Sequence, residues 1–151
     1  MRLDKEGVGD PYNLRRFLDA QQPVYEAVRG ELKDGCKRSH WMWFVFPQIE
    51  GLGQSHMAGK YAIKSREEGN AYLDHPVLGH RLRECAALVA NLDGLLIEDI
   101  FGYPDDLKFR SSMTLFGEIA PGGGIFRECL EKYFEGKPDV KTLALLSARP
   151  S

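Results

Sequence analysis

The sequence predicts an all-α fold, a single compact orthogonal domain of about seven to eight helices. Apolar residues recur at spacings of three and four along most of the chain, which is the period of an amphipathic helix. No two alternating apolar runs are joined by a tight turn such as Asn-Gly, so no β-hairpin is indicated. The 151 residues show no internal repeat. Residues 1–11 are polar and rich in glycine, so we expect a flexible leader there and one helical domain over residues 12–147.

The first part of this domain predicts two short amphipathic helices, or one helix kinked at Pro23. Gly35 stands where a glycine would cap the C-terminal end of the second helix. The apolar positions that set the helical period are Leu14, Phe17, Leu18, Val24, Val28 and Leu32.

Residues 39–48 form the densest aromatic stretch, Ser-His-Trp-Met-Trp-Phe-Val-Phe-Pro-Gln. As a strand the stretch would be continuously apolar, and its β-propensity is high. As a helix it would be apolar almost all round and therefore central. We favour a helical or irregular core segment, because the rest of the chain offers few strand partners, and Pro47 ends it in either case.

Two serines mark the next helix starts. Ser55 would cap a short helix that reaches Ile63. Ser65, with Glu68 three residues later, fits a capping box that opens a helix to Leu73. The strongest helical period in the chain then follows over residues 76–91, with a proline at its start.

The last third predicts three more helices and one short apolar run. The run covers residues 95–101 and stops at a glycine, after which a proline opens a helix over residues 104–119. Residues 121–124, Pro-Gly-Gly-Gly, make the strongest break in the chain. Helical patterns resume over residues 126–136 and 140–146.

Composition excludes several classes of protein. A hydrophobic fraction of 43% with 28% charged residues is ordinary for a globular domain. The net charge of -2 lacks the basic excess of proteins that bind duplex nucleic acid. No apolar run approaches the ~18 residues of a membrane span, and the first residues lack the apolar run expected of a signal peptide. We therefore expect a cytoplasmic protein, a monomer or weak dimer.

The cysteines and histidines show no metal-binding pattern. Three cysteines, Cys36, Cys85 and Cys129, lie far apart without a Cys-x-x-Cys pair, which is typical of free thiols in a reducing compartment. The four histidines lack the helical spacing of a zinc site, and no glycine-rich loop matches a nucleotide-binding fingerprint. We expect neither a metal nor a cofactor.

The helix predicted after Gly102 carries a candidate anion site. Serines in mid-helix are unfavourable by propensity, whereas lysine, arginine and hydroxyl groups together suit a phosphate or carboxylate. The candidate ligand-binding residues are Lys108, Arg110, Ser111 and Ser112. The structural alternative is a surface ion pair between Asp106 and Arg110, spaced i,i+4.

The aromatic stretch offers a second set of candidates. Trp41, Trp43 and Phe46 could pack against a planar ring, with Gln48 reading its edge. The structural alternative is plain core packing. The candidates for acid–base catalysis are Asp105, Asp106 and His40.

Several runs of residues closely resemble a known family. They are residues 39–48, Gly-Leu-Gly at 51–53, Tyr-Ala-Ile at 61–63, Tyr-Leu-x-His-Pro-Val-Leu-Gly at 72–79 and Phe-Gly-x-Pro-Asp-Asp-x-Lys-x-Arg-Ser-Ser-Met-Thr-Leu-Phe at 101–116. They resemble the domain of unknown function 1810 family, small bacterial proteins sometimes labelled calpastatin, over residues 12–147. This resemblance implies a mainly helical single domain without an established activity.

A fainter likeness is to a helical family that acts on ADP-ribose derivatives, although Ser39-His40 stands where that family has a Glu-His pair. It leads to the first of two hypotheses, a site for an anionic, nucleotide-like ligand of the ADP-ribose type. An N-glycosidic hydrolase of ADP-ribose conjugates would be the corresponding enzyme. The second hypothesis is a non-catalytic protein-interaction module in which the same residues form the core and a contact surface.

Overall fold

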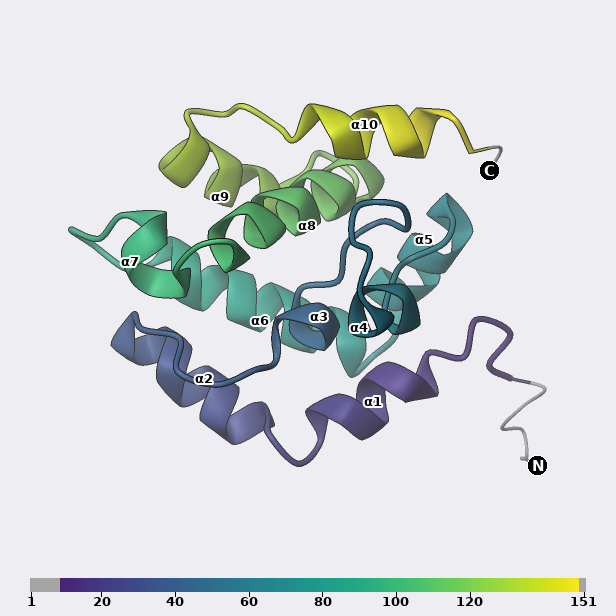
Figure 1. The fold of residues 1–151 in the computed structure, drawn as a ribbon, viewed down its shortest axis with the longest axis horizontal. Helices are drawn as coiled ribbons and strands as arrows, with labels where there is room; N and C mark the ends of the chain where they lie inside the picture. The colour runs from purple at the N-terminus through teal and green to yellow at the C-terminus, as the bar shows by residue number, and fades with distance from the viewer. Residues whose placement is uncertain (1–8, 150–151) are drawn as a thin grey trace.

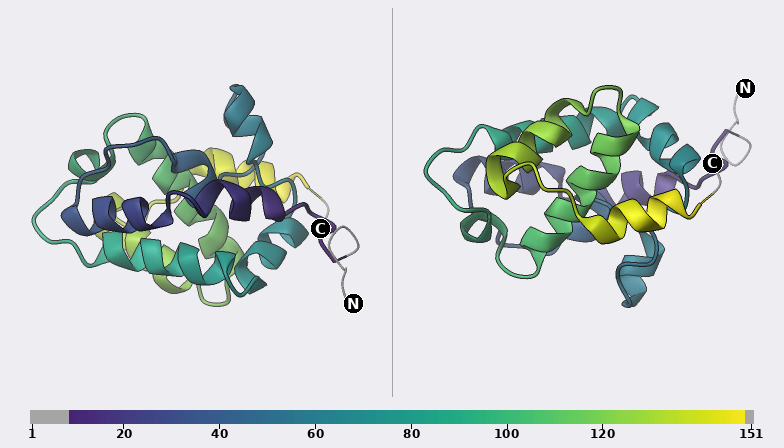
Figure 2. Two further views of the ribbon diagram at one scale, coloured as in Figure 1. Left: turned by 90° about the horizontal axis from the view of Figure 1, so that it is seen from below. Right: turned by 90° about the horizontal axis from the view of Figure 1, so that it is seen from above.

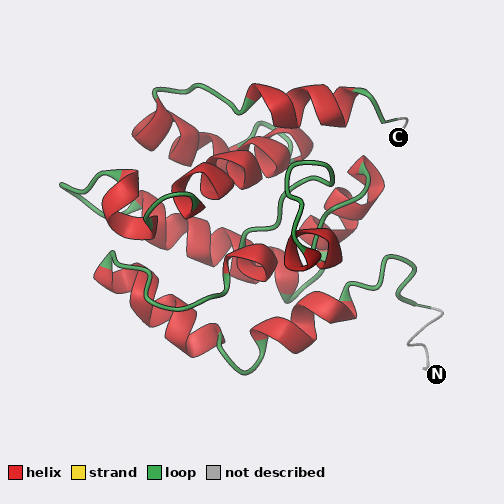
Figure 3. Cartoon of the chain, in the orientation of Figure 1, coloured by secondary structure: helices red, strands yellow, loops and turns green. Residues whose placement is uncertain are grey.

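The computed structural model describes residues 9–149, which form a single α-helical domain (Figures 1 and 3). The all-α prediction is confirmed, and residues 1–8 of the predicted leader lie outside the described part. The ten helices of residues 9–149 are α1 (Arg15–Gln21), α2 (Tyr25–Asp34), α3 (Met42–Val45), α4 (His56–Lys60), α5 (Arg66–Asp74), α6 (Leu78–Ala90), α7 (Ile97–Phe101), α8 (Asp105–Ile119), α9 (Gly124–Phe134) and α10 (Val140–Ser147). Their number exceeds the predicted seven to eight because two short helices, α3 and α7, form in the aromatic stretch and in the apolar run over residues 95–101.

Helix α8 lies at the centre of the domain. It contacts α5, α7, α9 and α10, and its residues from Ser111 to Gly117 are buried without a gap (Figure 1). A helix that is buried on all sides needs neighbours on every face. Helices α1 and α2 lie along one side of the domain and α10 along the other, with α6 and α9 between them (Figure 1).

The aromatic stretch runs through the core as a single helical turn followed by an extended piece. Helix α3 covers only Met42–Val45. Beyond Pro47, Ile49 forms an isolated parallel bridge with Ile63, in which the Ile63 N–H donates to the Gln48 carbonyl at 2.9 Å. These residues adopt a helical or irregular core segment, as predicted.

Local signals account for several helix ends. Pro23 separates α1 from α2, so the chain forms two helices rather than one kinked helix. Gly35 takes the left-handed conformation with φ 71° as the C-cap of α2. The hydroxyls of Ser55 and Ser65 accept N–H donors at 3.1 and 3.0 Å and cap α4 and α5. Helix α4 ends at residue 60, earlier than predicted, because Ile63 is drawn into the bridge.

Helix α4 projects from the rest of the domain in both views of Figure 2. None of its five residues is buried. Among the described residues, no helix is both long and apolar enough to cross a membrane.

Candidate functional site

The site begins with the loop that joins α2 to α3, which a single carboxylate holds in place. Glu31 accepts hydrogen bonds from the Arg38 N–H (2.8 Å), the Ser39 N–H (3.1 Å) and hydroxyl (2.6 Å), and the Trp41 indole N–H (2.9 Å). Burial alone would raise the pKa of Glu31, but these donors together lower it to about 2. The loop is tied at its other side by the Lys37 N–H, which donates to the Ile100 carbonyl at 2.7 Å.

This loop brings Lys37 to the first turn of α8. The Lys37 ammonium lies 2.8 Å from Asp105, and the Lys108 ammonium lies 3.7 Å from the other oxygen of the same carboxylate. The side chains of Lys37, Asp105 and Lys108 are 8%, 21% and 27% exposed. Two ammonium groups therefore share one carboxylate, which leaves an excess positive charge in a partly desolvated place.

Each of the two lysines also lies over an indole ring. The Lys37 ammonium is 5.1 Å from the centre of the Trp41 ring, and the Lys108 ammonium is 5.1 Å from the centre of the Trp43 ring. Trp41 is buried, whereas Trp43 is half-buried and keeps part of its surface in solvent. We call Lys37, Trp43, Asp105 and Lys108 the lysine–tryptophan cluster.

The structure thus brings together three of the predicted residues, Trp43, Asp105 and Lys108. Trp41 and Phe46 lie in the hydrophobic core, where both contact the Phe101 ring. Their burial agrees with the core-packing alternative.

The remaining aromatic-stretch and acidic candidates, Asp106, Gln48 and His40, take no part in the contacts described above. Asp106 is buried and accepts the Leu107 N–H at 2.9 Å. Gln48 is half-buried, and His40 is exposed on the loop that precedes Trp41.

Arg110 and Ser111 are turned away from the lysine–tryptophan cluster. The Arg110 guanidinium donates to the carbonyls of Lys137 (3.0 Å) and Pro138 (3.3 Å), so the predicted ion pair with Asp106 does not form. The Ser111 hydroxyl contacts the Leu107 carbonyl and the Asp139 carboxylate at 3.1 and 3.2 Å. Side chains two residues apart on a helix point about 200° apart, which separates Arg110 from Lys108.

Ser112 lies one helical turn after Lys108 and therefore on the same face of α8. It is fully buried, and its hydroxyl has no hydrogen-bond partner among residues 9–149. An unpaired buried hydroxyl carries a free-energy cost of about 1–3 kcal/mol.

Sequence reasoning missed two residues of this site, Lys37 and Glu31. Lys37 was visible as part of a basic pair just before the aromatic stretch, and that was the available signal. Glu31 lies within a helix pattern that carries no sign of its role, because its four donors come from the following loop. Within the described residues, no three His, Cys, Asp or Glu side chains gather in a way that would hold a metal ion.

Comparisons with known proteins identify the family. The family model described as "Protein of unknown function (DUF1810)" matches residues 11–146. No curated protein matches the chain. The crystal structure of the conserved hypothetical protein Rv1873 from Mycobacterium tuberculosis is similar, with 54% identity and a TM-score of 0.90 over 91% of this chain and 99% of that one. The chain therefore belongs to the DUF1810 family of proteins of unknown function.

Proposed function

We propose that the protein binds a small anionic, nucleotide-like molecule at the lysine–tryptophan cluster. One observation carries the proposal: the Lys108 ammonium lies over the partly exposed Trp43 ring and, with Lys37, shares the single carboxylate of Asp105. A phosphate would meet an excess positive charge, and a base could stack on the free part of the indole.

The position of Asp105 at the start of α8 supports this reading. The N-terminal end of a helix carries partial positive charge, which favours an anion there. The two lysines are already held close to one carboxylate, so an incoming phosphate would compete for ammonium groups that need little reorganisation.

The proposal is for binding rather than for a named reaction. A hydrolytic role needs a carboxyl or imidazole group that is free to exchange a proton. Asp105 is engaged by both lysines, and Asp106 accepts a helix N–H. His40 is exposed on the adjoining loop and is the catalytic candidate to replace by alanine if a substrate of the ADP-ribose type is found.

The experiment is an NMR titration of the amide and indole resonances with phosphate, AMP, NAD and ADP-ribose. We expect saturable shifts at the Trp43 indole and at Lys108. Lys108→Met should weaken AMP binding at least ten-fold, and Trp43→Leu should weaken AMP more than phosphate, because only AMP carries a ring.

Lys60→Met is the matched control. Its ammonium also lies over an aromatic ring, 5.3 Å from the centre of Tyr61, but on the projecting helix α4. If Lys60→Met weakens AMP binding as much as Lys108→Met does, the loss of affinity comes from the change in net charge, and the assignment of the binding site is wrong.

The alternative function is a protein-interaction module, and one observation favours it. Tyr103 and Leu107, which flank the start of α8, are 79% and 47% exposed. This alternative would be favoured over the anion site if none of the four ligands shifted any resonance and if a protein partner lost its binding in Tyr103→Ser.

A further inference from the structure

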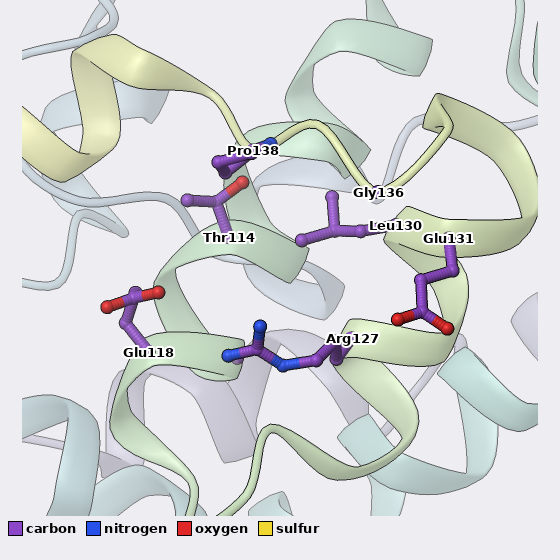
Figure 4. Close-up of a pocket in the computed structure, with 8 residues that line it drawn as sticks. Thr114, Glu118, Arg127, Leu130, Glu131, Gly136 and Pro138 are labelled. Atoms are coloured by element: carbon purple, nitrogen blue, oxygen red, sulfur yellow. The ribbon is translucent and has the colours of Figure 1, made fainter.

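A pocket separate from the lysine–tryptophan cluster lies between α8 and α9, under the linker to α10 (Figure 4). Its volume is about 70 Å³. A single water molecule needs about 10–15 Å³ of such space, so the pocket has room for about five or six non-hydrogen atoms. The side chains that define it are Thr114, Glu118, Arg127, Leu130, Glu131 and Pro138.

Three charged side chains line this pocket, and all three are exposed to solvent. In Figure 4 the Arg127 guanidinium lies between the carboxylates of Glu118 and Glu131. None of the three forms an ion pair or a side-chain hydrogen bond with another residue in the part of the chain described. Both signs of charge are therefore available to a molecule in the pocket.

The linker that closes the pocket is held in place by hydrogen bonds. Arg110 donates to the carbonyls of Lys137 and Pro138, and the Asp139 N–H donates to the Thr114 hydroxyl at 2.9 Å. The Thr114 hydroxyl donates in turn to the Arg110 carbonyl at 2.8 Å. These contacts give Arg110 a role that the sequence did not suggest, because they fix one wall of the pocket before any ligand arrives.

Arg127 itself depends on a glycine for its position. A Cβ atom at Gly123 would lie 2.4 Å from Arg127 Nε and 2.9 Å from Arg127 Cβ. Gly123 also has a φ of 82°, which other residues adopt rarely. The absence of a side chain at this position gives the arginine the space to lie along the pocket.

We propose that this pocket binds a small zwitterion, a free α-amino acid with a small side chain. The carboxylate of such a molecule would pair with the Arg127 guanidinium, which binds carboxylates through two parallel hydrogen bonds. Its ammonium group, with three donors, would pair with one of the two carboxylates that flank the guanidinium, Glu118 or Glu131. Leu130 and Pro138 supply apolar surface for a methyl-sized side chain.

The charge pattern favours a zwitterion over a simple anion or a simple cation. A purely anionic molecule would face two carboxylates, and a purely cationic one would face a guanidinium. A ligand with both charges a few bonds apart can pair with the guanidinium and with a carboxylate at once. A molecule larger than a few non-hydrogen atoms would exceed the pocket.

The test is a two-dimensional NMR titration with glycine and alanine, and separately with acetate and with methylammonium, at constant ionic strength. We expect saturable shifts for the amino acids at Gly117, Gly136 and the Arg127 side-chain N–H. Arg127→Gln and Glu118→Gln should each weaken alanine binding at least ten-fold.

Arg66→Gln and Glu67→Gln on α5 make the same chemical changes away from the pocket and should leave the affinity unchanged. The proposal is overturned if the amino acids cause no saturable shift, if acetate binds as tightly as alanine, or if Arg127→Gln binds alanine normally. Because the residues differ from those of the lysine–tryptophan cluster, either proposal can fail while the other stands.

Discussion

Glu31 organises the loop that carries Lys37 to the candidate site. Four donors from residues 38, 39 and 41 converge on its carboxylate, and one of them is the indole N–H of the buried Trp41. Hydrogen bonds to a charged acceptor are stronger than neutral ones, and breaking them leaves donors without partners. The side chain therefore links the stability of the domain to the geometry of the lysine–tryptophan cluster.

Glu31→Gln should lower the free energy of unfolding at pH 7 by about 3 kcal/mol, because the amide NH₂ would face donors. The pKa of Glu31 is about 2, below its ordinary value of 4.5, so the ionised form favours the folded state. This contribution is present above pH 4.5 and is lost as the pH falls towards 2. Urea denaturation at pH 7 and pH 3 should show that the difference in the free energy of unfolding between variant and wild type is smaller at pH 3.

Glu26→Gln provides the control on the same helix. The Glu26 side chain is 84% exposed and pairs only with Arg29, so its replacement should change stability by less than about 0.5 kcal/mol. A Glu31→Gln variant as stable as Glu26→Gln would show that the loop does not depend on the carboxylate.

Helices α5 and α6 meet so closely that one position admits only glycine. A Cβ atom at Gly79 would lie 2.0 Å from the Leu73 carbonyl oxygen and 2.9 Å from its carbonyl carbon. Both atoms belong to the backbone of α5, which cannot rotate out of the way as a side chain could. By contrast, nothing lies within 4 Å of a Cβ atom at Gly30 in α2.

The same substitution should therefore have opposite effects at the two positions. Gly79→Ala should cost about 2–3 kcal/mol through the backbone clash, whereas Gly30→Ala should stabilise by about 1 kcal/mol through helix propensity. For a chain of this length, the melting temperature should fall by about 5–10 °C in the first variant and rise by about 2–4 °C in the second. Thermal unfolding followed by circular dichroism measures both, and a Gly79→Ala variant as stable as the wild type would refute the close approach.

The aromatic core ties the helices into one unit. The Phe109 ring from α8 stacks on Phe101 at 4.8 Å and meets Phe46 edge-to-face at 5.0 Å. Two turns further along the same face of α8, Phe116 contacts Tyr72 of α5 and Phe126 of α9. A core that is continuous through the central helix favours a single cooperative unfolding transition.

Thiol reactivity reports on this cooperativity. Cys36 is exposed, whereas Cys85 and Cys129 are buried, and burial raises the pKa of both buried thiols to about 12. Only the thiolate reacts, so at pH 8 a disulfide reagent should modify Cys36 rapidly and the other two thiols only on unfolding. Cys36→Ser should abolish the rapid phase. Rapid modification of more than one thiol would mean that α6 and α9 separate locally in the native state.

The helices could be predicted because their limits depend on neighbours in the chain. Pro23, Gly35, Ser55 and Ser65 act within one turn, through a missing N–H, a positive φ or a capping hydroxyl. Where a distant partner intervenes, as Gln48 does at Ile63, the predicted boundary was wrong.

The candidate site was predictable only in part. Helical periodicity alone places Lys108 and Arg110 on nearly opposite faces of the helix, so this separation could be predicted from the sequence. That Lys37 would meet Asp105, and that Glu31 would collect four donors, depends on how a loop folds over a helix far along the chain. Such contacts depend on the packing between elements, and the local pattern of residues does not predict which helix faces will be in contact.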